Sequence, residues 1–452
     1  MERKALNNLS RWLTSANRKP LVLRGARQVG KTWLVRALAK KSGKKLIELN
    51  FEKQRSMAAH FESHDPKTIL LNLENALNES IDPSQAILFL DEIQATPELF
   101  ATLRWFYEEM PELTVIAAGS LLEFVLEDHT FSMPVGRVSY FFLEPLGFEE
   151  FLLAKNETHL YAALQNCTLN QPLDDALHEK ANQLFKEYLL IGGMPEAIST
   201  WLQTHSLEAL RQTQQDLIHT YEDDFSKYTE QLSSHYFETV FTALPKHLGK
   251  KWTYSHIDDR AEKQADITRT LTLLIKARLC HPIQNMETNG ELSGTETDSK
   301  TFKMILIDVG LVSALLGLKL DQFKTIEDLM FTHQDILAEQ IVGQLLRLTS
   351  PFYIDPFLHY WTHDAYGTSV EIDYLIQHEQ NIVPIQVKAH SMERLPSLHQ
   401  LMHKKNWPCI VRFHTGQASS SQINIKNPQD HNIRYQLLSL PFYLTEQVHR
   451  LL

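Results

Sequence analysis

The sequence predicts an α/β fold whose first domain contains a parallel sheet. Three apolar runs, each about as long as a strand buried on both faces, carry this prediction: Leu21–Leu23, Ala86–Leu90 and Val115–Ala118. Each run ends in polar or glycine residues, and after the first run apolar residues recur at helical spacing from Trp33 to Leu38. A length of 452 residues predicts about two to four domains.

Composition and charge narrow the class of protein. A formal net charge of -11 argues against tight nonspecific binding of nucleic acid by the whole surface, although it leaves room for a local basic groove. The three cysteines are far apart and predict neither a disulfide framework nor a zinc site. The N-terminus does not resemble a signal peptide, and no apolar stretch approaches the ~20 residues that span a bilayer. We therefore expect a cytoplasmic protein with no membrane partner.

The segment after the first apolar run fills the pattern G-x-x-x-x-G-K-[ST], which binds nucleotide phosphates. Glycines let the backbone bring its N–H groups against phosphates, and the following helix N-terminus favours an anion. The lysine is expected to reach the β and γ phosphates, and the threonine hydroxyl to ligate Mg²⁺. The predicted nucleotide-binding residues are Gly25, Ala26, Arg27, Gln28, Val29, Gly30, Lys31 and Thr32.

Two carboxylates directly follow the second apolar run. At the end of a buried parallel strand beside a phosphate loop, Asp91 is expected to hold Mg²⁺ together with Thr32, and Glu92 to polarise the attacking water as general base. The alternative is that the two acids only cap the next helix. The intact phosphate loop upstream favours the catalytic interpretation.

Two further residues are candidates for the same site. Ser120 follows the third apolar run, where a polar side chain can contact the γ-phosphate or the water; it can equally cap the helix that begins at Leu121. Arg137 precedes the strand-like segment Val138–Phe142. Such an arginine is usually a solvated surface residue, but in an oligomer it can stabilise the transition state in a neighbouring subunit.

These motifs resemble those of the AAA+ superfamily of ATPases, in particular a prokaryotic group whose biological role is largely unassigned. The resemblance rests on residues 25–32, 90–94, 136–137, 188–197 and 307–311. It implies ATP rather than GTP, Mg²⁺ as cofactor, ATP hydrolysis, a possible homo-oligomer, and a helical lid over the nucleotide. With the apolar periodicity, it predicts a P-loop domain at 1–145 and the lid at 146–230.

Residues 231–320 are compatible with a winged-helix-like region, because two helical patterns precede a polar gap at 287–300 and a strand. Within it, Lys246–Trp252 is basic and carries an aromatic residue. DNA contact and protein docking are both possible for this segment, and so is an ordinary solvated surface.

The last predicted domain, residues 321–452, contains a second group of chemically suitable residues. Residues 370–376 and 382–388 read as a hairpin, so Glu371 and Asp373 share one face of the first strand and Gln386 and Lys388 one face of the second. This pattern resembles the restriction-endonuclease-like nuclease fold, in which an Asp and a Glu-x-Lys motif hold Mg²⁺ and activate water. Glu339 matches the upstream acid often found in that fold.

The hairpin departs from the nuclease pattern at one position. Gln386 replaces the usual carboxylate and removes a negative charge from the predicted metal site. Pro384 further predicts an edge strand or a bulge. An active nuclease, an inactive relic or binding module, and a salt-bridged surface hairpin all remain open.

Three functions follow from these features, and all share ATP hydrolysis. The first is an ATPase that couples turnover to DNA or a nucleic-acid complex. The second is a slow ATP-dependent signalling switch that binds protein partners, which the negative net charge favours. The third is a metal-dependent nuclease gated by ATP.

Overall fold

The computed structural model describes residues 2–120, 122–123, 134, 136–227, 234–253, 261–286, 297–319, 322–332, 334–365, 368–387, 399, 402, 405, 407–426 and 432–452. The chain forms two compact units. The first contains Met1–Pro145, Lys276–Leu279 and Ser350–Asp355, and the second contains Leu146–Ile275, Cys280–Thr349 and Pro356–Leu452. Lys388 and much of the predicted polar gap, 287–296, lie outside the described residues.

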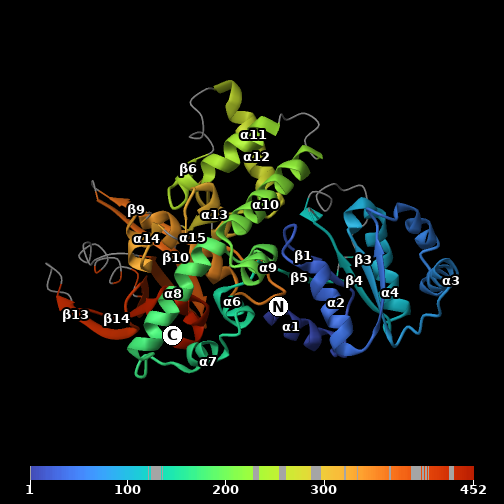
Figure 1. Ribbon diagram of the computed structural model, residues 1–452, viewed down its shortest axis with the longest axis horizontal. Coiled ribbons are helices and arrows are strands. Elements are labelled where there is room, and N and C mark those ends of the chain that lie inside the picture. The colour runs from blue at the N-terminus through green and yellow to red at the C-terminus, as the bar shows by residue number, and fades with distance from the viewer. Residues whose placement is uncertain are drawn as a thin grey trace. The chain divides into compact units, whose positions relative to one another are not determined.

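A five-stranded parallel sheet forms the centre of unit 1, as predicted (Figure 1). Its order is β2-β3-β4-β1-β5. The strands are β1 (Leu21–Arg24), β2 (Lys45–Asn50), β3 (Ala86–Asp91), β4 (Thr114–Ala118) and β5 (Ser139–Phe142). Every residue of β3 and β4 is buried, which explains their unbroken apolar sequence. Because the strands are parallel, the residues that follow β1, β3 and β4 meet at one edge of the sheet.

Helices cover this sheet. In Figure 1, α2 lies on one side of β3 and β4, and α3 and α4 lie on the other. The α3 and α4 side packs through an apolar cluster that includes Leu73, Leu88, Phe106 and Val115. The helices of unit 1 are α1 (Lys4–Leu13), α2 (Lys31–Ser42), α3 (Pro66–Leu77) and α4 (Leu103–Glu109), with short 3-10 helices at Arg55–Phe61, Ile93–Ala95 and Pro97–Thr102.

Two short segments from the second half of the chain complete unit 1. The Phe142 amide donates to the Phe352 carbonyl over 2.8 Å, so the segment Ser350–Asp355 lies beside β5. The rings of Phe141 and Phe352 stack with centroids 4.8 Å apart. A residue range of 1–145 therefore accounts for most of this unit but lacks these two segments.

Helices form the first part of unit 2, where the sequence predicts a lid. The helices of this unit are α6 (Phe148–Ala154), α7 (Thr158–Asn166), α8 (Asp175–Ile191), α9 (Pro195–Thr204), α10 (Leu207–Lys227), α11 (Ser234–Ala243), α12 (Ala261–Lys276), α13 (Val309–Leu315), α14 (Ile326–Thr332), α15 (Gln334–Arg347) and α17 (Val448–Leu451), with short 3-10 helices at Leu244–His247 and Phe442–Gln447. None of the described helices is long and apolar enough to cross a membrane.

Unit 2 also contains a mixed nine-stranded sheet of order β13-β14-β12-β11-β10-β9-β7-β8-β6. Its strands are β6 (Trp252–Thr253), β7 (Cys280–Met286), β8 (Thr297–Leu306), β9 (Leu358–Ala365), β10 (Thr368–His378), β11 (Asn381–Val387), β12 (Cys409–His414), β13 (Ser419–Lys426) and β14 (Asn432–Pro441). The strands of the predicted winged-helix region, β6 to β8, are continuous with those of the C-terminal region. The division of residues 146–452 into three domains stays a prediction.

The predicted hairpin forms as β10 and β11, which pair antiparallel from Tyr374 opposite Ile385 to His378 opposite Asn381. The expectation that Pro384 marks an edge strand is wrong, because β11 lies between β10 and β12. Proline is tolerated here because the parallel register with β12 begins one residue later, at Ile385. The missing N–H of Pro384 therefore falls just outside that ladder.

Buried Asp308 joins two of the motifs quoted for the family resemblance. One carboxylate oxygen accepts from the amides of Gly310 and Leu311 and caps α13, and the other accepts from the Gly193 amide over 2.5 Å. Burial raises the pKa of Asp308 to about 6, although these hydrogen bonds oppose the shift. Gly192 has φ +84°, and a Cβ there would lie 2.0 Å from the Asp308 Oδ1. Glycine is therefore required at this junction.

Candidate nucleotide site and acidic cluster

The loop between β1 and α2 has the backbone of a phosphate cradle. Gln28 (φ +65°) and Gly30 (φ +97°) are left-handed, which turns successive N–H groups toward one side of the loop. A Cβ at Gly25 would lie 2.4 Å from the Leu143 carbonyl oxygen, so a larger residue would displace the loop or β5. The twelve-residue helix α2 begins directly after the loop, at Lys31, and its N-terminus favours an anion.

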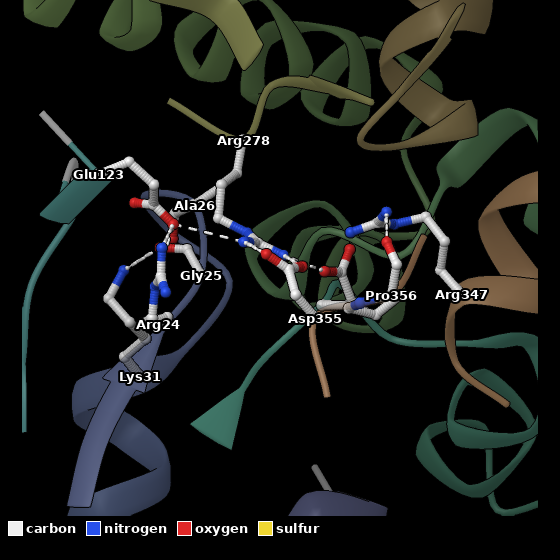
Figure 2. Close-up of polar contacts among 10 residues, drawn as sticks. Arg24, Gly25, Ala26, Lys31, Glu123, Arg278, Arg347, Asp355 and Pro356 are labelled. Carbon is white, nitrogen blue, oxygen red and sulfur yellow. Dashed lines mark hydrogen bonds and ion pairs between the residues drawn. The ribbon is translucent and has the colours of Figure 1, made fainter. Parts of the chain in front are cut away.

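The Lys31 side chain folds back onto this loop. Its ammonium donates to the carbonyls of Gly25 (2.9 Å) and Ala26 (2.7 Å), as Figure 2 shows. The side chain is buried, and desolvation lowers the pKa of Lys31 to about 8, although the carboxylates of Glu92, Asp91 and Glu123 oppose the shift. Phosphate oxygens would replace these two carbonyls as acceptors and place further negative charge next to the buried ammonium.

Thr32 and Asp91, the two residues predicted to hold Mg²⁺, are in contact. The Thr32 hydroxyl donates to the Asp91 Oδ2 over 3.1 Å, and the buried Asp91 Oδ1 has no hydrogen-bond partner among the described residues. Desolvation and the neighbouring Glu92 raise the pKa of Asp91 to about 6. A hydroxyl and a carboxylate are the oxygen ligands that Mg²⁺ prefers, and a cation would stabilise the ionised Asp91. These residues therefore fit a magnesium ion bound with a nucleotide.

Glu92 is held at the end of β3 by three donors. Its Oε2 accepts from the Gln94 side chain (2.6 Å), the Ser120 hydroxyl (3.2 Å) and the Ser120 amide (3.3 Å). Glu92 has the left-handed backbone φ +51°, an uncommon conformation for a glutamate and one found often at functional sites. The structure thus brings Ser120 to Glu92, with the phosphate loop at the same edge of the sheet.

Arg137 lies outside this constellation within unit 1. Its side chain is exposed, and its Nε donates to Glu108 over 2.7 Å. The guanidinium also lies over the Tyr107 ring. Its contribution to a neighbouring subunit's site stays a prediction.

Sequence reasoning missed several residues at this edge. Asn50, at the end of β2, lies 3.4 Å from the Asp91 Oδ2, and its position as the polar residue after a strand was a usable signal. Gln94 was quoted in the family motif without a role. Arg24 donates to Glu123 over 3.0 Å, and nothing local to either residue indicated this pair.

Three acids of the predicted nuclease site converge in unit 2, around a lysine that sequence reasoning missed. The Lys303 ammonium on β8 lies 2.9 Å from Glu339 and 3.8 Å from Asp373, and it forms an ion pair with Glu371. Lys303 is fully buried. Its only sequence signal was a charge between apolar neighbours, Phe302 and Met304.

Burial disfavours the charged forms of both Glu339 and Lys303 in this cluster. Desolvation and the nearby Asp373 raise the pKa of Glu339, although Lys303 opposes the shift. Desolvation alone would lower the pKa of Lys303, but Glu339, Asp373 and Glu371 outweigh it and raise the pKa. The lysine therefore stays charged and occupies the position between the acids that a cation would take.

Two residues of the predicted nuclease site remain, Gln386 and Lys388. Gln386 lies on β11, and Lys388 follows that strand outside the described residues. The Asp373 Oδ2 accepts from the Val387 amide over 2.7 Å, which anchors the hairpin. Within the described ranges, no group of three or more His, Cys, Asp or Glu residues is arranged to hold a metal ion.

The basic segment Lys246–Trp252 is partly committed to internal contacts. Trp252 is buried, and its indole donates to the His247 carbonyl over 2.9 Å. Lys251 donates to Thr362 over 2.6 Å and lies 3.7 Å from Glu371. Lys246 and Lys250 are exposed. These two lysines are what remains of the predicted DNA-contacting surface in this segment.

Comparison with known families agrees with this geometry. Residues 17–152 match the model described as an AAA domain. The matched range contains the phosphate loop and all five strands of the unit 1 sheet. Residues 182–322 and 335–430 each match a different domain of unknown function.

Similar solved structures include two of RuvB from Thermotoga maritima, one of them titled a Holliday junction branch migration motor. They share 15% and 14% sequence identity with this chain, cover 62% of it and 89% of their own chains, and have a TM-score of 0.29. PCH-2 from C. elegans shares 15% identity over 46% of this chain and 65% of its own, with a TM-score of 0.26. None of the curated proteins compared with the chain matches it.

Proposed function

We propose that the protein is a Mg²⁺-dependent ATPase whose catalytic site lies at the edge of the unit 1 sheet. One observation carries the proposal: the phosphate loop, the Thr32–Asp91 pair and the Glu92–Ser120 pair lie at the ends of three neighbouring parallel strands. In this proposal Lys31 binds the β and γ phosphates, and Glu92 accepts a proton from the attacking water. Mg²⁺ supplies charge neutralisation for the phosphates when bound.

The Oε2 of Glu92 would have to change partners to take that role. Its Oε2 is engaged by Gln94 and Ser120, and a general base needs an oxygen within hydrogen-bond reach of the water. A water bound beside a γ-phosphate would compete for the same oxygen. Ser120 would then be free to contact the γ-phosphate or the water, as a sensor does.

The test is ATP turnover measured for wild type, Lys31→Ala and Glu92→Gln. Lys31→Ala should lose nucleotide binding, whereas Glu92→Gln should keep binding and lose hydrolysis by about 10² to 10⁴-fold, the usual contribution of a general base. Parallel reactions with GTP test the preference for adenine. Turnover in Glu92→Gln equal to that of wild type would remove Glu92 from the mechanism.

We further propose that turnover is coupled to DNA or a nucleic-acid complex, with a slow protein-binding switch as the alternative. Exposed Lys246 and Lys250 support the first, and the net charge of -11 supports the second. Stimulation of turnover by duplex or single-stranded DNA that Lys31→Ala abolishes would favour the first. Turnover indifferent to DNA, with tight retention of ADP, would favour the second.

A second candidate function concerns unit 2, where three nuclease-type acids converge on Lys303. Their convergence supports descent from a nuclease site, and the lysine between them favours a form without metal catalysis. Incubation of supercoiled and linear DNA with Mg²⁺ or Mn²⁺, with and without ATP, tests this point. Cleavage that Asp373→Ala abolishes would instead establish an active nuclease.

A further inference from the structure

Arg278 lies far in sequence from the nucleotide-binding residues but belongs to the same compact unit. It stands between α12 and β7, in the segment Lys276–Leu279 of unit 1. The side chain is only 7% exposed. Its backbone is left-handed, at φ +59°, which is uncommon for an arginine and persists only where surrounding contacts impose it.

Three carboxylates surround the Arg278 guanidinium (Figure 2). Asp355 accepts two hydrogen bonds, of 2.9 and 2.6 Å, in a bidentate pair. Glu123 and Glu144 accept one each, over 3.3 and 3.2 Å. The guanidinium also lies 5.2 Å from the centroid of the Phe142 ring. A planar fork with several donors suits this arrangement, whereas a lysine could not reproduce it.

Glu123 connects Arg278 to the phosphate loop. The same Oε1 that accepts from Arg278 also accepts from Arg24 over 3.0 Å. Arg24 is the last residue of β1 and directly precedes Gly25, whose carbonyl accepts from Lys31. Glu123 also follows Ser120, the partner of Glu92, by three residues. The Glu123 carboxylate thus binds Arg24, the residue directly before the phosphate loop, and lies three residues after Ser120, the predicted sensor.

We propose that Arg278 is a positioning residue for the nucleotide site, which holds Glu123, and through it Arg24, in the arrangement that accepts the nucleotide phosphates. This inference rests on the proposed ATPase function. The chain enters the Arg278 segment from α12 and leaves it into β7, both largely in unit 2. The shape of the phosphate loop then depends on a residue that the second half of the chain supplies.

Removing the guanidinium should disturb binding more than chemistry. Glu123, Glu144 and Asp355 would be left with one shared cation fewer, and Glu123 would move away from its neighbours or draw Arg24 with it. Arg278→Gln should raise the Kd and the KM for ATP about tenfold, while kcat at saturating ATP changes less than about threefold. Arg278→Lys keeps the charge but not the planar fork, so its Kd for ATP should lie between those of wild type and Arg278→Gln.

Arg347 provides a matched control, because it is a buried arginine of unit 2 that donates to the Pro356 carbonyl over 2.5 Å (Figure 2). Arg347→Gln should lower stability to denaturant and leave the Kd for ATP within about twofold of wild type. Kd is measured with a fluorescent ATP analogue, KM and kcat by phosphate release, and folding by denaturant titration. If Arg278→Gln does not fold, Asp355→Asn, which weakens the bidentate pair, takes its place.

A double-mutant cycle separates positioning from general destabilisation. If Arg278 acts through Glu123, the losses of ATP affinity in Arg278→Gln and Glu123→Gln should be clearly less than additive when combined. Additive losses, an unchanged Kd in Arg278→Gln, or the same loss in Arg347→Gln would each overturn the inference. Wild type is measured alongside: if it binds and hydrolyses no ATP, the proposed function fails, and that result is distinct from the outcomes above.

Discussion

The buried Lys31 predicts a specific dependence of ATP affinity on pH. Desolvation lowers the pKa of the buried Lys31 to about 8. Bound phosphates favour the ammonium form strongly, so binding above that pH requires the lysine first to take up a proton. Between about pH 6 and about pH 7 the affinity should therefore be nearly constant, and it should fall as the pH rises through about 8.

The magnitude follows from the fraction of protonated lysine. With a pKa of about 8, about nine-tenths of Lys31 is charged at about pH 7, but only about 3% at about pH 9.5. The apparent Kd should thus rise about 30-fold across this range, equivalent to about 2 kcal/mol. The increase should approach tenfold per pH unit at the alkaline end.

Titration of a fluorescent ATP analogue from about pH 6.5 to about pH 9.5 at constant ionic strength measures this dependence. Lys31→Arg is the control, because arginine keeps its charge throughout this range. Its affinity can be lower than that of wild type but should vary little with pH. A flat profile in wild type, or the same slope in Lys31→Arg, would show that Lys31 is not the titrating group.

Three further predictions test other parts of the structure. Lys303→Met should lower the free energy of unfolding by about 3–5 kcal/mol, because the buried acids lose their cation. Lys180→Met, which removes an exposed ion pair, should lower it by less than about 1 kcal/mol. Urea denaturation compares the two variants, and similar losses would contradict the role of Lys303. Affinity for Mg·ATP should fall as the pH drops below about 6, because Asp91, whose pKa is raised to about 6, becomes protonated there and no longer binds the cation. Calorimetric titration should find this fall in wild type and not in Asp91→Asn. Gly192→Ala should lower the free energy of unfolding by about 1–3 kcal/mol, because the added Cβ would meet Asp308. Gly43 is also left-handed, but a Cβ there would have nothing within 4 Å, so Gly43→Ala should lower it by about 1 kcal/mol or less. Equal melting temperatures for the two variants would refute the clash.

The arrangement of the candidate nucleotide site was largely predictable because its signals are local. Each strand of the parallel sheet is a short apolar run, and the residues that follow β1, β3 and β4 reach the same edge in any parallel arrangement. The pattern of the phosphate loop also specifies its own backbone, through glycines where a Cβ does not fit and a helix that begins at Lys31. The roles of Glu92, Ser120 and Arg137 remain predictions.

The sequence by itself determined the parallel sheet of unit 1 and the order of the phosphate loop and Asp91 along it, because periodicity and loop chemistry act over a few residues. Only the tertiary structure decided that Lys303 lies among the nuclease-type acids, and that Arg278 and Asp355 complete the surroundings of Glu123. A charged residue carries no sequence signal for its partner when the two lie on separate elements. The pairing arises from burial, where an unpaired charge is too costly, and so it follows from the packing of the whole unit.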